Sequence, residues 1–94
     1  MVCKTFNGKC EKYHFFVLCK GMNAGKPLKQ STANCFIIVC ETQAEKDFYQ
    51  SLCFALWKAK IFERELIGSV IPFIRLPEFR QVVNHYARLT NNQP

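Results

Sequence analysis

The sequence predicts a single α+β domain, or a small α/β one, with a sheet of about three or more strands packed by two helices. Three observations predict this fold. Two short apolar segments, 13–19 and 35–40, are rich in aromatic and β-branched residues, as strands are. Two later segments, 43–60 and 77–89, repeat apolar residues every three or four positions, as amphipathic helices do. Finally, 49% of the 94 residues are hydrophobic, which is enough for one core.

The elements of the first half follow from local composition. Residues 1–12 show no sustained period, so we interpret them as either a frayed start or a short edge strand. Residues 13–19 form the first clear strand. Residues 21–34 contain two glycines, a proline and short polar residues, which predict a long loop. Residues 35–40 are apolar throughout, which predicts a central strand covered on both faces.

The second half is predicted to be mainly helical. Thr42 and Glu45 have the spacing of a capping box, so a helix is expected from about Gln43 to Lys60. Residues 61–66 are expected to hold one more helical turn. Residues 68–76 contain a proline and are interpreted as an edge strand or an extended turn. Pro77 opens the last helix, and residues 90–94 form a polar tail.

Composition also limits the class of protein. The high apolar content excludes a disordered chain, and no segment recurs at a fixed period. Apolar runs reach only six residues, and the first residues lack the pattern of a secretory signal, so we expect a soluble cytoplasmic protein that does not engage a membrane. The six cysteines are expected to be free thiols, with Cys3 and Cys10 the most reactive.

No catalytic constellation is found in the sequence. It contains no nucleophile elbow, no phosphate-binding glycine loop and no metal-binding helix motif. His14 and His85 have no carboxylate or cysteine at motif spacing, and the scattered acidic residues are explained by helix capping and solvation. We therefore expect no enzyme activity, no catalytic residue, no metal and no cofactor.

Charge is distributed unevenly along the chain. The formal net charge is +6, and the first forty residues hold six lysines against one glutamate. Such an excess favours an anionic partner, most often nucleic acid. It is equally compatible with a solvated face that keeps a small protein soluble, and charge alone does not separate these two interpretations.

Two resemblances add to this reading. Segments 21–28, 34–36, 56–57 and 68–75 resemble a family of uncharacterised short proteins, a domain of unknown function carried by gut anaerobes and their mobile elements. Residues 48–80 show a weaker similarity to the target-recognition domains of type I restriction specificity subunits. The shared features are the order Phe48-Tyr49, Leu52, Leu56, Lys58-Ala59-Lys60, Phe62 and then the turn Gly68-Ser69-Val70-Ile71-Pro72. This second resemblance implies an α/β fold and sequence-specific binding of duplex DNA by a shortened, isolated recognition domain, because the long spacer helices of those subunits are missing.

The first functional hypothesis is therefore a small, non-catalytic DNA-binding module. Lysines around the long loop are expected to neutralise phosphates, and polar loop side chains to contact base edges. The cations near the end of the long helix also suit the negative end of its dipole, which needs no partner. The candidate contact residues are Lys20, Asn23, Lys26, Lys29, Lys58, Lys60, Arg64, Arg75 and Arg80.

The alternative hypothesis is a protein-interaction module, such as an accessory factor or inhibitor from a phage or mobile element that acts on a host defence protein. It rests on the aromatic excess, because exposed aromatic side chains are common binding anchors. The candidate anchors are Tyr49, Trp57 and Phe62. A homodimer is compatible with either hypothesis, because so small a core gains from burying more apolar surface.

Overall fold

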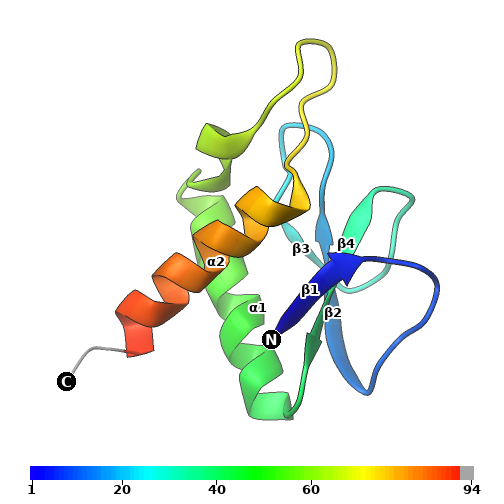
Figure 1. The fold of residues 1–94 in the computed structure, drawn as a ribbon, viewed down its shortest axis with the longest axis vertical. Coiled ribbons are helices and arrows are strands. Elements are labelled where there is room, and N and C mark those ends of the chain that lie inside the picture. Colours follow the sequence, from blue (N-terminus) through cyan, green and yellow to red (C-terminus); the bar gives the residue numbers. More distant parts are fainter. Residues whose placement is uncertain (92–94) are drawn as a thin grey trace.

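The computed structural model describes residues 1–91 and confirms the predicted α+β fold. Four strands form one antiparallel sheet, and two helices and a short 3-10 helix follow them (Figure 1). The elements are β1 (Val2–Thr5), β2 (Tyr13–Leu18), β3 (Pro27–Leu28), β4 (Cys35–Cys40), α1 (Gln43–Lys58), η1 (Phe62–Glu65) and α2 (Leu76–Asn91).

The sheet has the strand order β1-β4-β2-β3, with every neighbouring pair antiparallel. Strand β4 lies between β1 and β2, so its prediction as a central strand is confirmed. Ile38 of β4 faces Cys3 on one side and Phe15 on the other, which fixes the register of the three longer strands. The beginning of the chain forms β1, an edge strand, which decides between the two interpretations of residues 1–12.

The main core lies between the sheet and the two helices, which cover the same face of the sheet (Figure 1). Alternate strand residues point toward the helices, as the period of two in a β-strand requires. Val17 of β2 and Val83 of α2 are fully buried, and Phe79 of α2 packs its ring 5.6 Å from that of Phe36 of β4. This single layer of side chains joins every regular element except β3.

The opposite face of the sheet is also apolar. Phe16, Cys35 and Ile37 are buried there, and Phe6 from the β1–β2 connection packs its ring edge-on at 5.0 Å from that of Phe16. The connection therefore covers part of a face that carries no helix. As predicted, β4 is buried on both sides.

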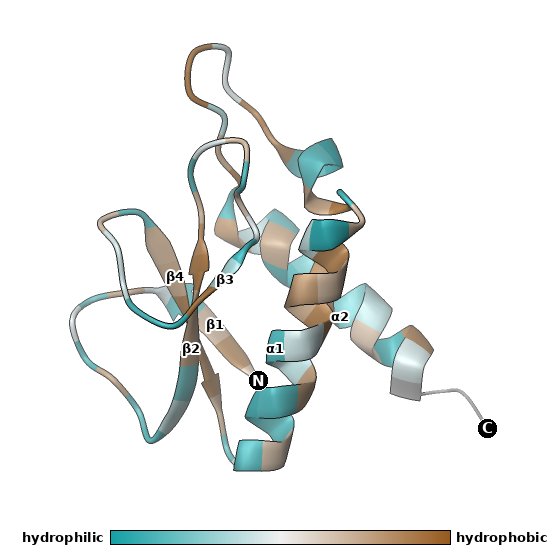
Figure 2. Ribbon diagram, turned by 180° about the vertical axis from the view of Figure 1, so that it is seen from behind, coloured by the Kyte–Doolittle hydropathy of each residue, from teal (hydrophilic) through white to brown (hydrophobic). Residues whose placement is uncertain are grey.

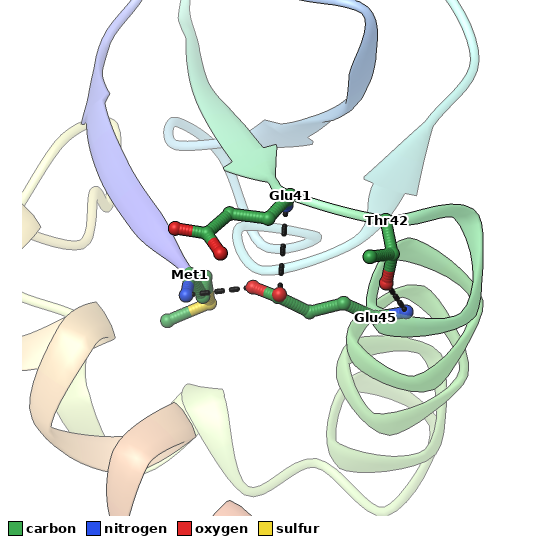
Figure 3. A network of polar contacts seen from close by, with 4 residues as sticks. All are labelled: Met1, Glu41, Thr42 and Glu45. Atoms are coloured by element: carbon green, nitrogen blue, oxygen red, sulfur yellow. Dashed lines mark hydrogen bonds and ion pairs between the residues drawn. The ribbon is translucent and has the colours of Figure 1, made fainter.

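The start of α1 is fixed by a small polar network (Figure 3). The Oγ1 of Thr42 accepts a hydrogen bond of 3.0 Å from the backbone N–H of Glu45, as a capping residue does. The Glu45 carboxylate accepts from the N–H of Glu41 at 3.5 Å, and its Oε1 lies 2.7 Å from the amino group of Met1. The predicted cap therefore also connects the start of α1 to the start of β1.

Some predicted boundaries differ from the structure. Helix α1 ends at Lys58 rather than Lys60, because the backbone reverses at Lys60. Helix α2 continues through Asn91, so residues 90 and 91 are helical and do not belong to a polar tail. The hydroxyl of Thr90 donates to the Tyr86 carbonyl at 3.0 Å. The rest of the predicted tail, residues 92–94, lies outside the described residues. The predicted turn within 61–66 is η1. Residues 67–73 form a short hairpin closed by pairing of Ile67 with Phe73, which agrees with the predicted extended turn, and α2 begins at Leu76 instead of Pro77. Within residues 1–91, neither helix combines the length and the apolar character needed to cross a bilayer.

Candidate nucleic-acid interface

A tight loop connects β2 to β3 and places Lys26 against the end of α1. The N–H of Leu18 donates to the Lys26 carbonyl at 3.0 Å, and the N–H of Gly25 donates to the Leu18 carbonyl at 2.7 Å. Gly25 has a φ of +101°, and a Cβ at this position would lie 2.6 Å from Cγ of Phe62. Only glycine allows the loop to lie directly on this ring. The loop is therefore held where its last residue reaches α1.

Trp57 lies at the meeting point of the loop and the helix. Its side chain is half-buried and packs against the main core. The Nζ of Lys26 is 5.0 Å from the centroid of its ring, and the Nζ of Lys58 is 5.7 Å from the same centroid. Both distances fall within the range of cation–π attraction. Two lysines from separate parts of the sequence thus flank one aromatic ring.

A surface depression opens beside this ring, with a volume of about 260 Å³. The β2–β3 loop forms one of its walls, and the end of α1 with the start of η1 forms the other. We call it the Trp57 hollow, and its lining residues are Met22, Asn23, Ala24, Trp57, Lys58, Lys60, Phe62 and Glu63. Three of the predicted DNA-contacting residues, Asn23, Lys58 and Lys60, line it. Two of the predicted aromatic anchors, Trp57 and Phe62, also line it, together with the carboxylate of Glu63.

The end of α1 explains how Lys60 reaches the Trp57 hollow. The N–H of Ile61 donates to the Leu56 carbonyl, and the N–H of Lys60 donates to the Trp57 carbonyl, both at 3.0 Å. This pair of bonds is the Schellman arrangement, in which the residue after the cap is left-handed and is usually glycine. Here that residue is Lys60, with a φ of 62°. The reversal directs the chain back toward the loop instead of extending the helix.

A second depression lies next to the first, along α1 and β3. Its volume is about 490 Å³, and its lining residues are Pro27, Leu28, Lys29, Asp47, Gln50, Ser51 and Phe54. We call it the Phe54 hollow. Phe54 is 51% exposed, and its ring centroid is 5.8 Å from that of Trp57, so the two aromatic rings connect the hollows. Lys29 therefore belongs to the same side of the molecule as Lys26, but to the neighbouring hollow.

The remaining predicted cations are distributed more widely. The backbone of Lys20 pairs with Phe73. Arg64 and Arg75 line a depression of about 350 Å³ with Ile67, Glu65 and Glu78. Arg75 is 2.7 Å from the carboxylate of Glu78, and this hydrogen bond lowers the pKa of Glu78. Arg80 donates to the carbonyl of Cys3 at 2.8 Å, so α2 uses it to hold β1 and it does not join the other candidates.

The three predicted aromatic anchors separate in the structure. Trp57 is half-buried beside the lysines, as described above. Tyr49 lines a different depression, with Asn84, Ala87 and Arg88, and burial raises the pKa of its hydroxyl. Phe62 is only 1% exposed and stacks on Phe79 with the ring centroids 5.1 Å apart. Its prediction as an exposed anchor is wrong, because the ring fills the space between η1 and α2.

The thiols follow the predicted free state but not the predicted reactivity. All six cysteines are free. Cys3 is buried, and burial raises its pKa to about 12, so the expectation that it reacts readily is wrong. Cys3 is buried because its side chain lies on the side of β1 that faces the helices. Cys10 is exposed, and its reactivity stays a prediction.

Sequence reasoning missed Phe54 and Met22, which are respectively 51% and 63% exposed at the two hollows. Phe54 precedes Trp57 by three positions, and this helical spacing could have placed both rings on one side of α1. Met22 lies in an irregular loop, where the sequence carries no comparable signal.

The fold and this surface define a small α+β protein that carries a lysine-flanked aromatic ring at the end of a helix. The chain belongs to a family of unknown function (DUF6943), and the model of that family matches residues 3–94. Comparisons with curated proteins and with solved structures find no similar protein.

Proposed function

We propose that this protein is a small, non-catalytic nucleic-acid-binding module, with duplex DNA as its ligand, and that the Trp57 hollow is the centre of its contact surface. The observation that carries the proposal is the meeting of Lys26 with Lys58 around the ring of Trp57. Lysines from two separate segments, gathered at one exposed surface, suit the closely spaced phosphates of a nucleic acid.

The surroundings of this cluster support the same ligand. Asn23 lines the hollow beside the lysines, and an amide side chain is able to pair with an adenine edge. Lys29 continues the basic surface into the Phe54 hollow. Residues 48–80, whose sequence pattern resembles restriction target-recognition domains, span most of α1, all of η1, the turn that follows and the start of α2, although the comparisons detect no such relative. Of the residues that the structure describes, Glu63 is the one acidic residue that lines the hollow.

The test is a binding titration of the reduced protein with a random-sequence duplex pool across a salt series. Wild type is compared with Lys26→Glu, Lys58→Glu and the matched control Lys9→Glu, which makes the same charge change at an exposed residue of the β1–β2 connection. We expect affinity to fall steeply with salt, and Lys26→Glu and Lys58→Glu each to lose on the order of tenfold at low salt with a shallower salt slope. Equal losses in all three variants, or no wild-type binding, would overturn the proposal.

A protein-interaction module is the second candidate, and the exposed ring of Phe54 favours it. This ring sits 5.8 Å from Trp57, in a hollow that also contains Asp47, Gln50 and Ser51, a mixture of aromatic and polar groups common at protein interfaces. A partner bound in this way would be retained at high salt and lost in Phe54→Ala. DNA binding would instead depend on the lysines and on low salt.

A further inference from the structure

A short hairpin, residues 67–73, projects from one end of the molecule, and its base pairs with the β2–β3 loop (Figure 1). Ile67 and Phe73 exchange two backbone hydrogen bonds, each of 2.9 Å, which close the hairpin at its base. Gly68 has a φ of +103°, and a Cβ there would lie 2.9 Å from the carbonyl oxygen of Ile71. The loop is thus tightly folded on itself.

The base of the hairpin is held by the β2–β3 loop. The N–H of Gly21 donates to the Pro72 carbonyl at 2.7 Å, and the N–H of Ile74 donates to the Cys19 carbonyl at 3.0 Å. Phe73 pairs with Lys20 on one side and with Ile67 on the other. These bonds form a three-segment ribbon that fixes the hairpin to the same loop that carries Asn23 and Lys26.

The tip of the hairpin is apolar and open to solvent. Val70 is 90% exposed and Ile71 is 58% exposed, and the tip stands out in the hydropathy colouring of Figure 2. Neither side chain belongs to the two buried clusters of the described chain. These two adjacent aliphatic side chains contribute nothing to the core, so their apolar surface is free to contact a partner.

Cations lie on both edges of the ribbon that carries this tip. Lys20 is on the edge formed by the β2–β3 loop. Arg64 and Arg75 line the depression at the other edge, beside Ile67, where Glu65 and Glu78 also lie. Arg75 is ion-paired with Glu78, so Lys20 on one edge and Arg64 on the other are the cations available to a ligand. An apolar point between two such cations suits a groove of duplex DNA, in which base edges lie between two phosphate backbones.

We propose that the Val70–Ile71 tip is an apolar wedge that enters the minor groove of duplex DNA and partly unstacks one base step. This inference rests on the proposed function and adds a mode of contact to it. Proteins that use aliphatic wedges in this way kink the duplex toward the major groove by roughly 20–90°. The tip offers two neighbouring aliphatic side chains for insertion at a base step. An anionic membrane surface is the competing partner for such a tip, and the test includes it.

The experiment measures both affinity and bending on a short duplex labelled at its two ends for energy transfer. Wild type is compared with the double variant Val70→Ser/Ile71→Ser and with Leu89→Ser, an exposed leucine of α2 that serves as a matched control. We expect wild type and Leu89→Ser to raise the transfer efficiency. The double variant should leave it unchanged and bind about tenfold more weakly. Circular dichroism checks that each variant is folded.

The other outcomes separate the two proposals. If the double variant binds and bends DNA as wild type does while Lys26→Glu still weakens binding, the wedge is refuted and the DNA-binding function stands. If wild type binds no duplex at low salt, both proposals fail. If wild type binds vesicles of phosphatidylserine and phosphatidylcholine but not DNA, and the double variant loses that binding, the tip is a membrane contact and the wedge is overturned.

Discussion

The Nζ of Lys26 lies 5.0 Å from the centroid of the Trp57 ring, and this contact joins the β2–β3 loop to the end of α1. It depends on the close approach of Gly25 to Phe62, which positions the preceding loop. A cation at one aromatic ring contributes only ~0.5–1 kcal/mol at an exposed site. The contact therefore matters less for stability than for the surface that it forms. There, Lys26 and Lys58 flank an aromatic ring that a ligand is able to reach.

Trp57 is the only tryptophan in the chain, so its fluorescence reports directly on the Trp57 hollow. We expect added duplex DNA to change the intensity and position of its emission, because phosphates would draw Lys26 and Lys58 away from the ring. A fluorescence titration measures this change. Lys26→Gln should already show altered emission without DNA. DNA binding detected by another method with no change in emission would place the interface elsewhere.

Gly25→Ala should destabilise the protein strongly. The new Cβ would overlap the ring of Phe62, and the φ of +101° disfavours any side chain. Together these effects predict a loss of about 2–4 kcal/mol in the free energy of unfolding. Gly8→Ala is the matched control, because Gly8 also has a positive φ but no neighbour within 4 Å, and it should cost only about 1 kcal/mol. Urea denaturation measures both, and equal losses would contradict the role assigned to Phe62.

Reactivity should distinguish the cysteines. Cys10 is exposed, whereas burial raises the pKa of Cys3 to about 12 and also raises that of Cys53. At pH 8 we expect a thiol reagent to modify Cys10 first, and Cys3 and Cys53 only on unfolding. The half-buried Cys19 should react after Cys10, because burial raises its pKa as well. Mass spectrometry after brief labelling identifies the sites, and Cys10→Ser should remove the fastest phase.

Much of the fold could be predicted because its signals are local. The apolar run 35–40 and the capping pair Thr42 and Glu45 each specify an element through residues close together in the sequence. The residues at which α1 and α2 end could not be predicted so well. The left-handed Lys60 ends α1 where a glycine would normally mark the end, so the sequence signal was absent.

The candidate site could be predicted only in part. The residue types were found, since Asn23, Lys58 and Lys60 all line one hollow. Their meeting with Trp57 depends on tertiary packing that no local pattern encodes. Phe62 shows the same limit, because a single helical turn does not reveal which of its residues faces the core, and this ring proved to be buried.

The ion pair between Glu45 and the amino group of Met1 makes part of the stability depend on pH. The hydrogen bond from that amino group lowers the pKa of Glu45 below its ordinary value of 4.5. A carboxyl group whose pKa is lowered by folding contributes stability above its ordinary pKa, and the contribution is lost as pH falls through the lowered value. Glu45→Gln should therefore cost about 0.5 kcal/mol at pH 7 and almost nothing near pH 2.

Urea denaturation of both proteins at the two pH values tests this expectation. Glu41→Gln provides the control, because it makes the same chemical change at an exposed neighbour whose side chain makes neither contact. A cost for Glu45→Gln that is the same at pH 7 and pH 2 would assign the effect to the helix cap and not to the ion pair.

Lys60 links stability to the proposed function, because its left-handed backbone is unfavourable for a residue with a side chain. Lys60→Gly should raise the free energy of unfolding by about 0.5–1 kcal/mol, since glycine adopts this conformation without strain. The same change removes a cation from the Trp57 hollow, so DNA affinity should fall. Lys60→Ala separates the two effects, because it keeps the strained backbone and removes the charge. We expect Lys60→Ala to match wild type in stability and Lys60→Gly in its weakened DNA binding. If Lys60→Gly is more stable and binds DNA as tightly as wild type, then Lys60 is not a DNA contact and the interface must rely on Lys26 and Lys58.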